Sequence, residues 1–574
     1  MTVATPRDNP TVLVLGRDIR AFLTTIRSLG RAGIQVHVGM CPANDHALDS
    51  RYVTRFHQIP DYSEDPDRWL QSLLELISKH RFRLVIPTHD ESVIPVQIHR
   101  DTLAQHCAVY ALESRAFELS MDKIASSRLA EDLSINVPRQ FEIDLQVSTP
   151  HLPDGISFPI VAKPPSSFAK DNLTQRREVI HLHSVPEMEA FVENHRSWGS
   201  ALVQEYFSGI GAGVEVLALD GEVLTAFQHL RVHEPIDGGA SSYRKSAALD
   251  PDLLLAAKKL IQALNYTGVA MIEFKINPVS GKWVFIEINA RFWGSLPLAV
   301  SAGVDFPLYL YQMLVEGRRV FPQQYKVPVF SRNLQRDIYW FSDNLKARLR
   351  NRHSHATTPL HKVAGEFFNL LLFREHIDSF ALDDPRPGIN EFKDVVSIFG
   401  NKLSDTIRSR FYRLLPVRRF VSWKIRNRIS QARSLLMVCY GNICRSPFAE
   451  LQVKKICGES LDIRSSGFHA QVDRPSPPVA VRVASEFGID LSHHRSSMLD
   501  KTLLDGSDVI LVFDEKNRKM ILERFPETKS RLFSIGFLLD TGPLEIEDPY
   551  GKDEQDFRDA YERITNAIRT LKCR

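Results

Sequence analysis

The segment VCYGNICRSP, residues 438–447, follows the apolar run SLLM and predicts a buried strand, a short loop and the start of a helix. A loop that enters a helix offers unpaired backbone N–H groups and the positive end of the helix dipole, so it favours a phosphate-like anion. The same field favours the thiolate form of Cys439, and the planar guanidinium of Arg445 could bind two phosphoryl oxygens. The C-x5-R spacing also arises by chance, in which case it is a buried cysteine beside a surface arginine.

The wider context favours the phosphate-binding interpretation. VCYGNICRSPFAE resembles the phosphate-binding loop of the low-molecular-weight protein tyrosine phosphatases. The likeness covers residues 434–574 and includes RSSGFHA, FGIDLSHHRSS, VFDEKNRKMI and EDPYGKD. It implies a compact α/β domain with a central parallel sheet.

The resemblance also implies roles for individual residues. Cys439 would be the nucleophile and Arg445 would stabilise the transferring phosphoryl group. Asp548 in EDPYGKD would protonate the leaving group and later activate water. Asn442 would brace the loop, and Ser446 would hydrogen-bond the thiolate. Tyr440 and Tyr550 would border the pocket and favour an aromatic phosphoester; the alternative for DPYG alone is a surface turn.

The chain has 574 residues, too many for one hydrophobic core. We predict an α/β multidomain protein whose parts are an α/β domain (1–115), an α+β core (116–315), a mixed extension with a basic linker (316–433) and the phosphatase domain (434–574). A net charge of +3 gives no general reason to expect nucleic acid as a partner. No run of about 18 apolar residues occurs, so we expect a cytoplasmic protein, and its six scattered cysteines should be reduced thiols.

The first 115 residues predict a β-α-β opening. TVLVLG and IQVHVG have the composition of buried strands, DIRAFLTTIRSLGRAG has helical periodicity, and RFRLVIPTHDESV is a further strand that enters a polar loop. From residue 116 the strands follow one another through glycine-containing turns, as in ALVQEYFSG and GVEVLALDGEVLTAF. That pattern indicates an antiparallel sheet.

Carboxylates on neighbouring strands indicate a metal site in this core. Glu273 lies in MIEFK, and Glu287 and Asn289 alternate along VFIEINARFWG, so both project to one face. Oxygen ligands suit Mg²⁺ or Mn²⁺, and Arg291 could reach a phosphoryl group held by the metal. The alternative is a set of solvent-facing charges on an edge strand. The E-x-N-x-R pattern resembles the ATP-grasp superfamily over residues 10–320, which implies a small α/β domain followed by an α+β ATP-binding core.

That second resemblance implies an ATP site. Lys123 and Lys163 match the lysines that hold ATP phosphates, although a lone lysine is usually solvated. In ALVQEYFSG, Glu205 would accept from the adenine amine while the backbone of Tyr206 and Phe207 pairs with the ring. Glu215 either reaches the ribose or lies on an exposed strand face. The segment PPSSFAKDN after Lys163 contains no glycine, in contrast to the lid of many relatives.

ATP-grasp enzymes typically activate a carboxylate as an acylphosphate that an amine captures. We therefore predict a bifunctional enzyme: a carboxylate–amine ligase, its acid and amine unknown, fused to a phosphatase acting on phosphotyrosine protein or a small phosphoester. The alternative is a nucleotide-sensing module that regulates the phosphatase. In HEPIDGGASSYRKS, the residues Ser242, Arg244 and Lys245 either fix the acid or form a solvated loop.

The linker is strongly basic. Residues 402–433 contain ten Lys or Arg and one acidic residue, with interleaved aromatic side chains. This segment could lie on an anionic membrane surface, which would make the protein peripheral at the membrane. The alternatives are a helix that docks the two enzymes on each other and, more remotely, an RNA-binding arm.

Overall fold

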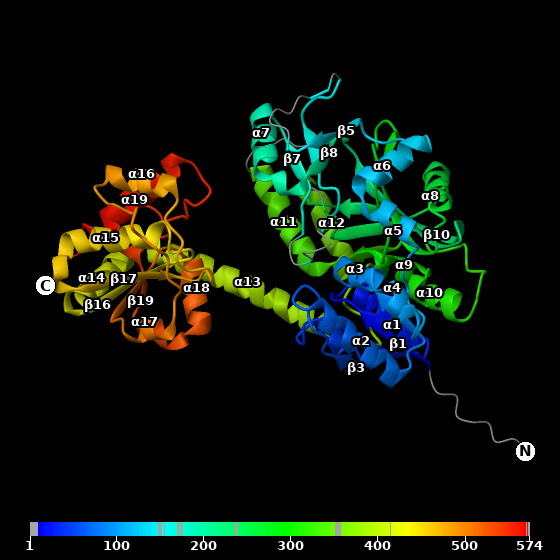
Figure 1. The fold of residues 1–574 in the computed structure, drawn as a ribbon, viewed down its shortest axis with the longest axis horizontal. Helices are drawn as coiled ribbons and strands as arrows, with labels where there is room; N and C mark the ends of the chain where they lie inside the picture. The colour runs from blue at the N-terminus through cyan, green and yellow to red at the C-terminus, as the bar shows by residue number, and fades with distance from the viewer. Residues whose placement is uncertain are drawn as a thin grey trace, which may run out of the picture. The chain divides into compact units, whose positions relative to one another are not determined.

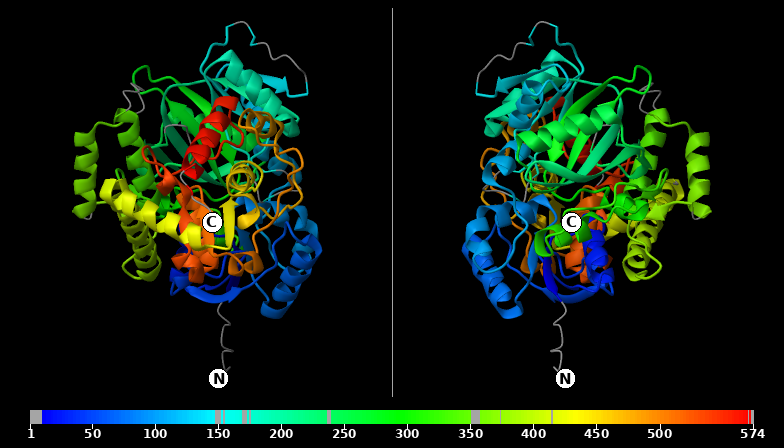
Figure 2. Two further views of the ribbon diagram at one scale, coloured as in Figure 1. Left: turned by 90° about the vertical axis from the view of Figure 1, so that its left-hand side faces the viewer. Right: turned by 90° about the vertical axis from the view of Figure 1, so that its right-hand side faces the viewer.

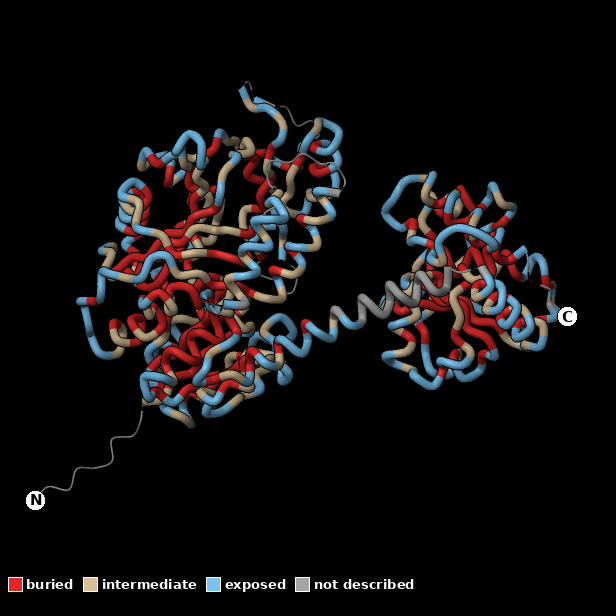
Figure 3. The backbone as a smooth tube through the Cα atoms, turned by 180° about the vertical axis from the view of Figure 1, so that it is seen from behind, coloured by how far each residue is buried: buried red, intermediate tan, exposed pale blue. Residues whose placement is uncertain are grey.

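In the computed structural model the chain divides into two compact units, residues 1–398 and 399–574, each with its own core. Figure 1 labels their elements, and Figure 3 shows buried backbone running through the middle of each unit. The structure describes residues 10–146, 152–153, 155–168, 173, 176–235, 239–349, 357–372, 374–413, 415–569 and 571.

The first unit begins with a parallel sheet of strand order β3-β2-β1-β4. Its strands are β1 (Thr11–Leu15), β2 (Gln35–Gly39), β3 (Val53–His57) and β4 (Leu84–Pro87). Alternate residues of β1 enter different cores, because Val12 and Val14 pack with α1 (Ala21–Arg31), while Leu13 and Leu15 pack with α2 (Pro66–His80). Helix α3 (Asp90–Ile98) follows β4, and α4 (Arg100–Ala104) follows α3. The predicted β-α-β opening is confirmed.

A large, mainly antiparallel sheet forms the middle of this unit, in the order β13-β12-β9-β10-β11-β14-β15. Its strands are β9 (Ile210–Leu219), β10 (Glu222–His233), β11 (Tyr243–Ala247), β12 (Gly268–Ile276), β13 (Trp283–Asn289), β14 (Phe330–Arg332) and β15 (His376–Ile377). Helices around it are α5 (Ser114–Met121), α6 (Lys123–Asp132), α8 (Pro251–Ala263), α9 (Leu296–Ala302), α10 (Phe306–Val315), α11 (Leu334–Leu349) and α12 (Leu360–Leu371). The predicted antiparallel arrangement is confirmed.

A smaller antiparallel sheet, β5-β8-β6-β7, completes the first unit. It contains β5 (Gln140–Asp144), β6 (Ile160–Lys163), β7 (Ile180–Leu182) and β8 (Ser200–Glu205), and α7 (Val185–Asn194) packs on it. Figures 1 and 2 show this sheet and the N-terminal parallel sheet at opposite ends of the unit, with the large sheet between them. The large sheet therefore has the small antiparallel sheet on one side and the N-terminal parallel sheet on the other.

The second unit is built on a four-stranded parallel sheet, β17-β16-β18-β19. The strands are β16 (Ser434–Cys439), β17 (Asp462–Gly467), β18 (Val509–Val512) and β19 (Leu532–Ser534). One face packs on α14 (Leu415–Gln431), α15 (Arg445–Cys457), α16 (Pro478–Glu486) and α19 (Glu554–Ile568), and the other on α17 (Lys501–Asp505) and α18 (Glu515–Arg524). The predicted central parallel sheet is confirmed.

The long helix α13 (Arg386–Arg413) includes the residue at which the two units divide. Among the described helices, none is by itself long and apolar enough to span a membrane. The bent pair α9 and α10 passes the same length and composition test when its two helices are taken together.

Two candidate active sites

The first site is the loop that joins β16 to α15. The buried apolar residues of β16 place Cys439 at the carboxyl end of a central strand, and the loop then turns into α15 at Arg445. Asn442, in the middle of the loop, has a φ of 50°, in the left-handed region that asparagine tolerates better than most residues. In this conformation the backbone N–H of Asn442 points at the cysteine sulfur.

Hydrogen-bond donors surround the sulfur of Cys439. The backbone N–H of Asn442 donates to Sγ at 3.3 Å, and the hydroxyl of Ser446 lies 3.0 Å from Sγ. Donors in this position stabilise a thiolate. Cys444 is also buried, and burial followed by the charge of Cys439 raises its pKa far above the usual range. Cys444 therefore stays protonated and does not compete as a nucleophile.

Asn442 holds the loop in place through its side chain. Its Nδ2 donates to the hydroxyls of Ser446 (3.0 Å) and Ser465 (2.9 Å), and its Oδ1 accepts from the backbone N–H of Ser497 at 2.8 Å. His494 Nε2 lies 2.7 Å from the carbonyl oxygen of Asn442. These contacts join the loop to β17 and to the segment around Ser497, as the predicted bracing role requires.

Arg445 is buried between two carboxylates. Its Nη1 donates to Asp514 at 2.6 Å and to the carbonyl of Ile546 at 2.9 Å, while its Nη2 donates to Asp548 at 2.6 Å. Burial works to lower the pKa of Arg445, but the charges of Cys439, Asp548 and Asp514 outweigh it and raise that pKa. The fold thus brings the predicted nucleophile, arginine and acid together.

Asp514 is a residue that the sequence analysis missed. It caps the N-terminus of α18 by accepting from the N–H of Asn517, and it lies two residues after the end of the buried strand β18. A carboxylate at the carboxyl end of a strand, next to the one that carries Cys439, was a signal that could have identified it.

Two aromatic residues lie close in the chain to the predicted reactive residues. Tyr440 is 41% exposed, its ring faces Lys516 at 5.1 Å, and Tyr550 is 63% exposed. Both follow a predicted reactive residue by one or two positions in the chain. Their exposure leaves their rings available to a substrate.

The cysteines need one correction. Cys41, Cys107, Cys439 and Cys444 are free, but Cys457 is disulfide-bonded. The expectation of reduced thiols is therefore wrong for Cys457, because scattered spacing does not tell which cysteines the fold brings together.

The second site lies on β12 and β13. Glu273 and Glu287 stand directly opposite each other across the two strands, and the Nδ2 of Asn289 lies 3.4 Å from a carboxylate oxygen of each. Three oxygen-bearing side chains thus converge on one face, as predicted. Such a donor set suits Mg²⁺ or Mn²⁺, so these residues fit the implied metal.

Cations of the protein neutralise both carboxylates. Lys123 forms an ion pair with Glu287, and Arg231 forms one with Glu273. Burial alone would raise the pKa of Glu287, but Lys123 and then Lys163 lower it well below its ordinary value. Arg231, on β10, was not predicted; its strand pattern gives no sign of this long-range pairing.

Lys163 is buried at the end of β6, and its Nζ lies 3.4 Å from the carbonyl oxygen of Ile286. Burial, followed by the charge of Lys123, lowers the pKa of Lys163 to about 8. The structure therefore brings both predicted phosphate-binding lysines to β13. Neither is a solvated surface lysine.

The predicted adenine hinge follows β8. The N–H of Glu205 donates to the carbonyl of Arg139 at 2.8 Å, and the N–H of Tyr206 donates to that of Pro159 at 3.1 Å. Because these donors are engaged in the sheet, the contacts of Glu205, Tyr206 and Phe207 with an adenine stay a prediction. The Tyr206 ring lies 5.0 Å from the ammonium of Lys275, a neighbour that the sequence analysis missed.

Glu215 is fully buried, so the alternative that placed it on an exposed strand face is wrong. Its Oε1 lies 2.5 Å from Nδ1 of His229 and accepts from Ser295 at 3.4 Å. Burial raises the pKa of Glu215 despite His229. A ribose contact of Glu215 stays a prediction.

The loop around Arg244 is also buried. Arg244 is ion-paired with Asp378, and the hydroxyl of Ser242 donates to Asp337 at 2.7 Å. The solvated-loop alternative for Ser242 and Arg244 is therefore wrong, because both residues belong to β11 or its entry and are covered by β14 and α11.

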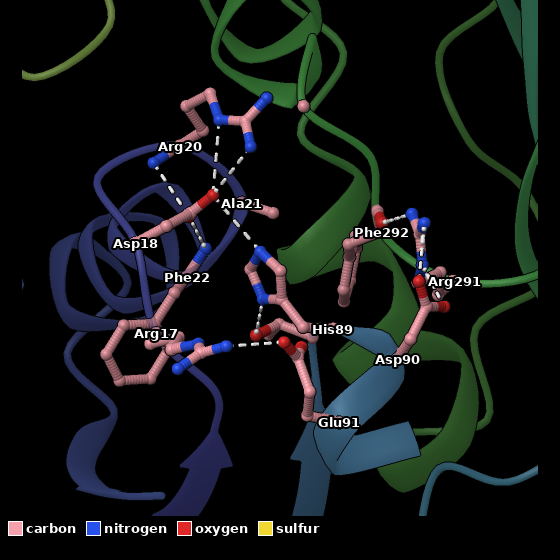
Figure 4. Close-up of polar contacts among 12 residues, drawn as sticks. Arg17, Asp18, Arg20, Ala21, Phe22, His89, Asp90, Glu91, Arg291 and Phe292 are labelled. Carbon is pink, nitrogen blue, oxygen red and sulfur yellow. Dashed lines mark hydrogen bonds and ion pairs between the residues drawn. The ribbon is translucent and has the colours of Figure 1, made fainter. Parts of the chain in front are cut away.

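Figure 4 shows the loops at the carboxyl ends of β1 and β4: the loop after β4 contacts Arg291 through Asp90 and the loop after β1 through His89. Arg291 donates to both carboxylate oxygens of Asp90, at 2.5 and 3.0 Å. Asp18 lies 3.1 Å from His89 Nε2 and accepts from Arg20 Nε at 3.2 Å. The sequence analysis missed these residues, although polar residues after parallel strands are a known sign of a ligand site.

Arg20 also lies against Gly294, since a Cβ at that glycine would be 2.3 Å from Arg20 Nη1. The charge of Arg20, followed by burial, lowers the pKa of Arg336 to about 10. Asp18 has a φ of 110°, a strained conformation for a residue other than glycine. A strained Asp18 thus pairs with Arg20, whose charge also acts on Arg336.

Helix α14, in the basic linker, belongs to the second unit. Arg418 is buried and donates to the carbonyls of Leu539 (2.7 Å) and Gly542 (2.8 Å), and Ile425 and Ile429 enter the core. Phe420 and Trp423, 63% and 57% exposed, stack on each other on the outside. One face of α14 therefore packs into the core of the second unit, and the other face is exposed.

The site combines a thiol beside hydrogen-bond donors, an arginine and an acid, and the thiol lies at the carboxyl end of a central parallel strand. This combination defines a cysteine-dependent phosphatase. Residues 434–573 match the family described as low molecular weight phosphotyrosine protein phosphatase, and this part of the chain belongs to it. Residues 198–334 match a family described as ATP-grasp in the biosynthetic pathway with Ter operon, and the first unit contains an ATP-grasp domain.

Two curated relatives and one solved structure illustrate the likeness. The chain is 33% identical over 136 residues to the probable low molecular weight protein-tyrosine-phosphatase EpsP of Ralstonia solanacearum, covering 24% of this chain and 91% of that protein. It is 33% identical over 139 residues to the protein-arginine-phosphatase of Geobacillus stearothermophilus, covering 24% and 92%. The L-amino acid ligase of Bacillus licheniformis is 17% identical, with 54% of this chain and 75% of that one covered and a TM-score of 0.43.

Proposed function

We propose that the protein is a bifunctional enzyme, a phosphomonoester phosphatase joined to an ATP- and Mg²⁺-dependent carboxylate–amine ligase. The observation that carries the phosphatase half is the position of Cys439 Sγ, which contacts the Asn442 N–H and the Ser446 hydroxyl. Arg445, at the other end of the same loop, is paired with Asp548.

In the phosphatase reaction the Cys439 thiolate attacks phosphorus, and the bond to the leaving oxygen breaks as Asp548 protonates that oxygen. Arg445 moves from its carboxylate partners to two phosphoryl oxygens and stabilises the transition-state charge. Asp548, now ionised, takes a proton from water, which attacks the cysteinyl-phosphate and releases inorganic phosphate and the thiolate.

The preferred substrate is an aryl phosphate such as phosphotyrosine, because Tyr440 in the loop and Tyr550, two residues after Asp548, offer exposed aromatic surface. Phosphoarginine is the second candidate, since one relative is a protein-arginine-phosphatase. Hydrolysis of phosphotyrosine, phosphoarginine and phosphoserine peptides by the full chain decides between them. Cys439→Ser should abolish release from every peptide while still binding vanadate or phosphate. Faster hydrolysis of the phosphoserine peptide would refute the aryl preference.

The ligase proposal rests on the carboxylate–amide group of Glu273, Glu287 and Asn289. When bound there, Mg²⁺ would neutralise ATP phosphates and the acylphosphate charge. Lys123 would leave Glu287 and, with Lys163, hold the phosphate groups. The acid would lie near Arg20 and Arg336, whose guanidinium groups are close enough to repel each other and are partly offset by Asp18. Asp18, beside His89, would receive the amine.

Formation of ADP tests this proposal against nucleotide sensing. The full chain is incubated with Mg-ATP and mixed carboxylate and amine pools, and coupled products are identified by mass spectrometry. Glu287→Gln should abolish acid-dependent ADP formation, while Glu222→Gln, an exposed carboxylate at the start of β10, should leave it unchanged. ATP binding by the parent protein without any acid-dependent ADP would instead support a sensor.

For location, we propose a cytoplasmic protein that is peripheral at an anionic membrane, since ATP must be present and α14 carries free aromatic and basic side chains. Phe420, Trp423, Arg419 and Arg428 are exposed on that helix. Changing Arg419 and Arg428 to Gln should reduce sedimentation with phosphatidylserine vesicles. Arg418 should not be included in such a variant, because it is a buried structural residue. Absence of vesicle binding by the parent chain would refute the proposal.

A further inference from the structure

Three histidines meet in the N-terminal parallel sheet, and none of them belongs to either site described above. His37 lies on β2, His57 ends the neighbouring strand β3, and His80 is the last residue of α2. One ring nitrogen of each lies within 4.8 Å of those of the other two. His37 is buried, whereas His57 and His80 are half-buried.

From this geometry we propose that His37, His57 and His80 form a binding site for a divalent transition metal, with Zn²⁺ as the preferred ion. Three imidazoles are a ligand set that Zn²⁺ accepts, with solvent in the fourth position. Nitrogen ligands do not suit Mg²⁺, so this site differs in chemistry from the acidic group on β12 and β13.

The hydrogen bonding of the rings supports this assignment. His37 Nδ1 and His57 Nε2 lie 2.9 Å apart, and the Nε2 of His80 is buried with no hydrogen-bond partner among the described residues. A buried nitrogen without a partner is costly, and a metal ion would supply one. The ring centroids are 4.8 to 5.0 Å apart, so the three rings already face one small volume.

Two cationic side chains, Arg55 and Lys79, act electrostatically on the rings. Arg55 and Lys79 would weaken the affinity for a cation, so Arg55→Gln should strengthen it.

The backbone holds the ligands near the required positions. Two of them stand on hydrogen-bonded parallel strands, and the third, His80, is followed by Arg81, the C-cap of α2, whose φ of 50° turns the chain. Zinc–nitrogen bonds of about 2.0–2.1 Å place tetrahedral ligand atoms roughly 3.3 Å apart, so each ring would move by about an ångström. Bound metal would tie the edge strand β3 to β2 and α2.

The test uses the full chain, without a histidine tag, after removal of metal by a chelator. Zn²⁺ is titrated by calorimetry, and Co²⁺ is titrated by absorption in a Cys439→Ser background, so that the phosphatase thiolate cannot bind it. The parent should bind one equivalent and show cobalt d–d bands without a thiolate charge-transfer band, and Zn²⁺ should raise its unfolding temperature.

His80→Gln should weaken binding at least about tenfold, because losing a ligand costs no less than losing an outer-shell partner. His106→Gln, an exposed histidine of the same domain, should bind like the parent. If His80→Gln does not fold, His57→Gln replaces it. Any of three results overturns the proposal. The parent and the histidine variants bind the metal equally, binding disappears only with Cys439→Ser, or the parent does not bind the metal.

Discussion

Replacing Asn442 should separate the stability of the phosphatase unit from its activity. Asn442→Ala removes the three side-chain hydrogen bonds of 3.0 Å or less, to Ser446, Ser465 and the Ser497 N–H, and a longer one from the Ser497 hydroxyl. At about 1 kcal/mol for each bond, the loss is about 3 kcal/mol. Alanine at a φ of 50° adds about 1 kcal/mol. The free energy of unfolding of this unit should therefore fall by about 4 kcal/mol.

Hydrogen exchange measures that change in the full chain. The amides of β16, a buried central strand, exchange through opening of the whole unit. A loss of about 4 kcal/mol accelerates their exchange roughly a thousandfold, since about 1.4 kcal/mol is a factor of ten. Asn427→Ala, on the exposed side of α14, should leave the rate nearly unchanged.

Asn442→Asp provides the comparison for activity. Its carboxylate can still accept from the Ser497 N–H and from the two hydroxyls, and aspartate tolerates the left-handed conformation, so exchange should accelerate only about tenfold. The negative charge close to Cys439 should nevertheless abolish most phosphatase turnover, because it repels both the thiolate and the phosphate. Exchange in Asn442→Ala that is no faster than in Asn442→Asp would refute the reasoning.

Three further predictions concern single residues. Asp548→Asn should slow the hydrolysis of esters with poor leaving groups by about a hundredfold to ten-thousandfold, but that of p-nitrophenyl phosphate far less. Glu547→Gln is the control, and equal slowing of both esters would exclude Asp548 as the acid. Because Lys163 loses its proton above about pH 8, the KM for ATP should rise as the pH passes through that value. Lys163→Arg should flatten the plot of KM against pH, and an unchanged slope in that variant would exclude Lys163 from the ATP site. Arg418→Gln should destabilise the second unit by several kcal/mol because it leaves buried carbonyls unpaired. Arg419→Gln should change the free energy of unfolding by less than about 0.5 kcal/mol, and similar values for the two variants would contradict the structural role of Arg418.

Local features of both units could be predicted from the sequence. Strand periodicity and the C-x5-R spacing placed Cys439 and Arg445 on one loop, because seven consecutive residues of a strand–loop–helix unit have little conformational freedom. The alternation of Glu287 and Asn289 likewise fixed a shared face on β13. The role of Asp548 came from resemblance to a family, not from spacing.

Only the tertiary structure decided which distant residues meet. Arg445 contacts Asp514 across 69 positions, Lys123 contacts Glu287 across 164, and Arg291 contacts Asp90 across 201. Periodicity reports which face of an element is buried, but it does not report which element covers that face or which charge neutralises another. The pairing of Glu215 with His229 and the meeting of three histidines at the edge of a sheet therefore depend on strand order and packing, which no local pattern contains.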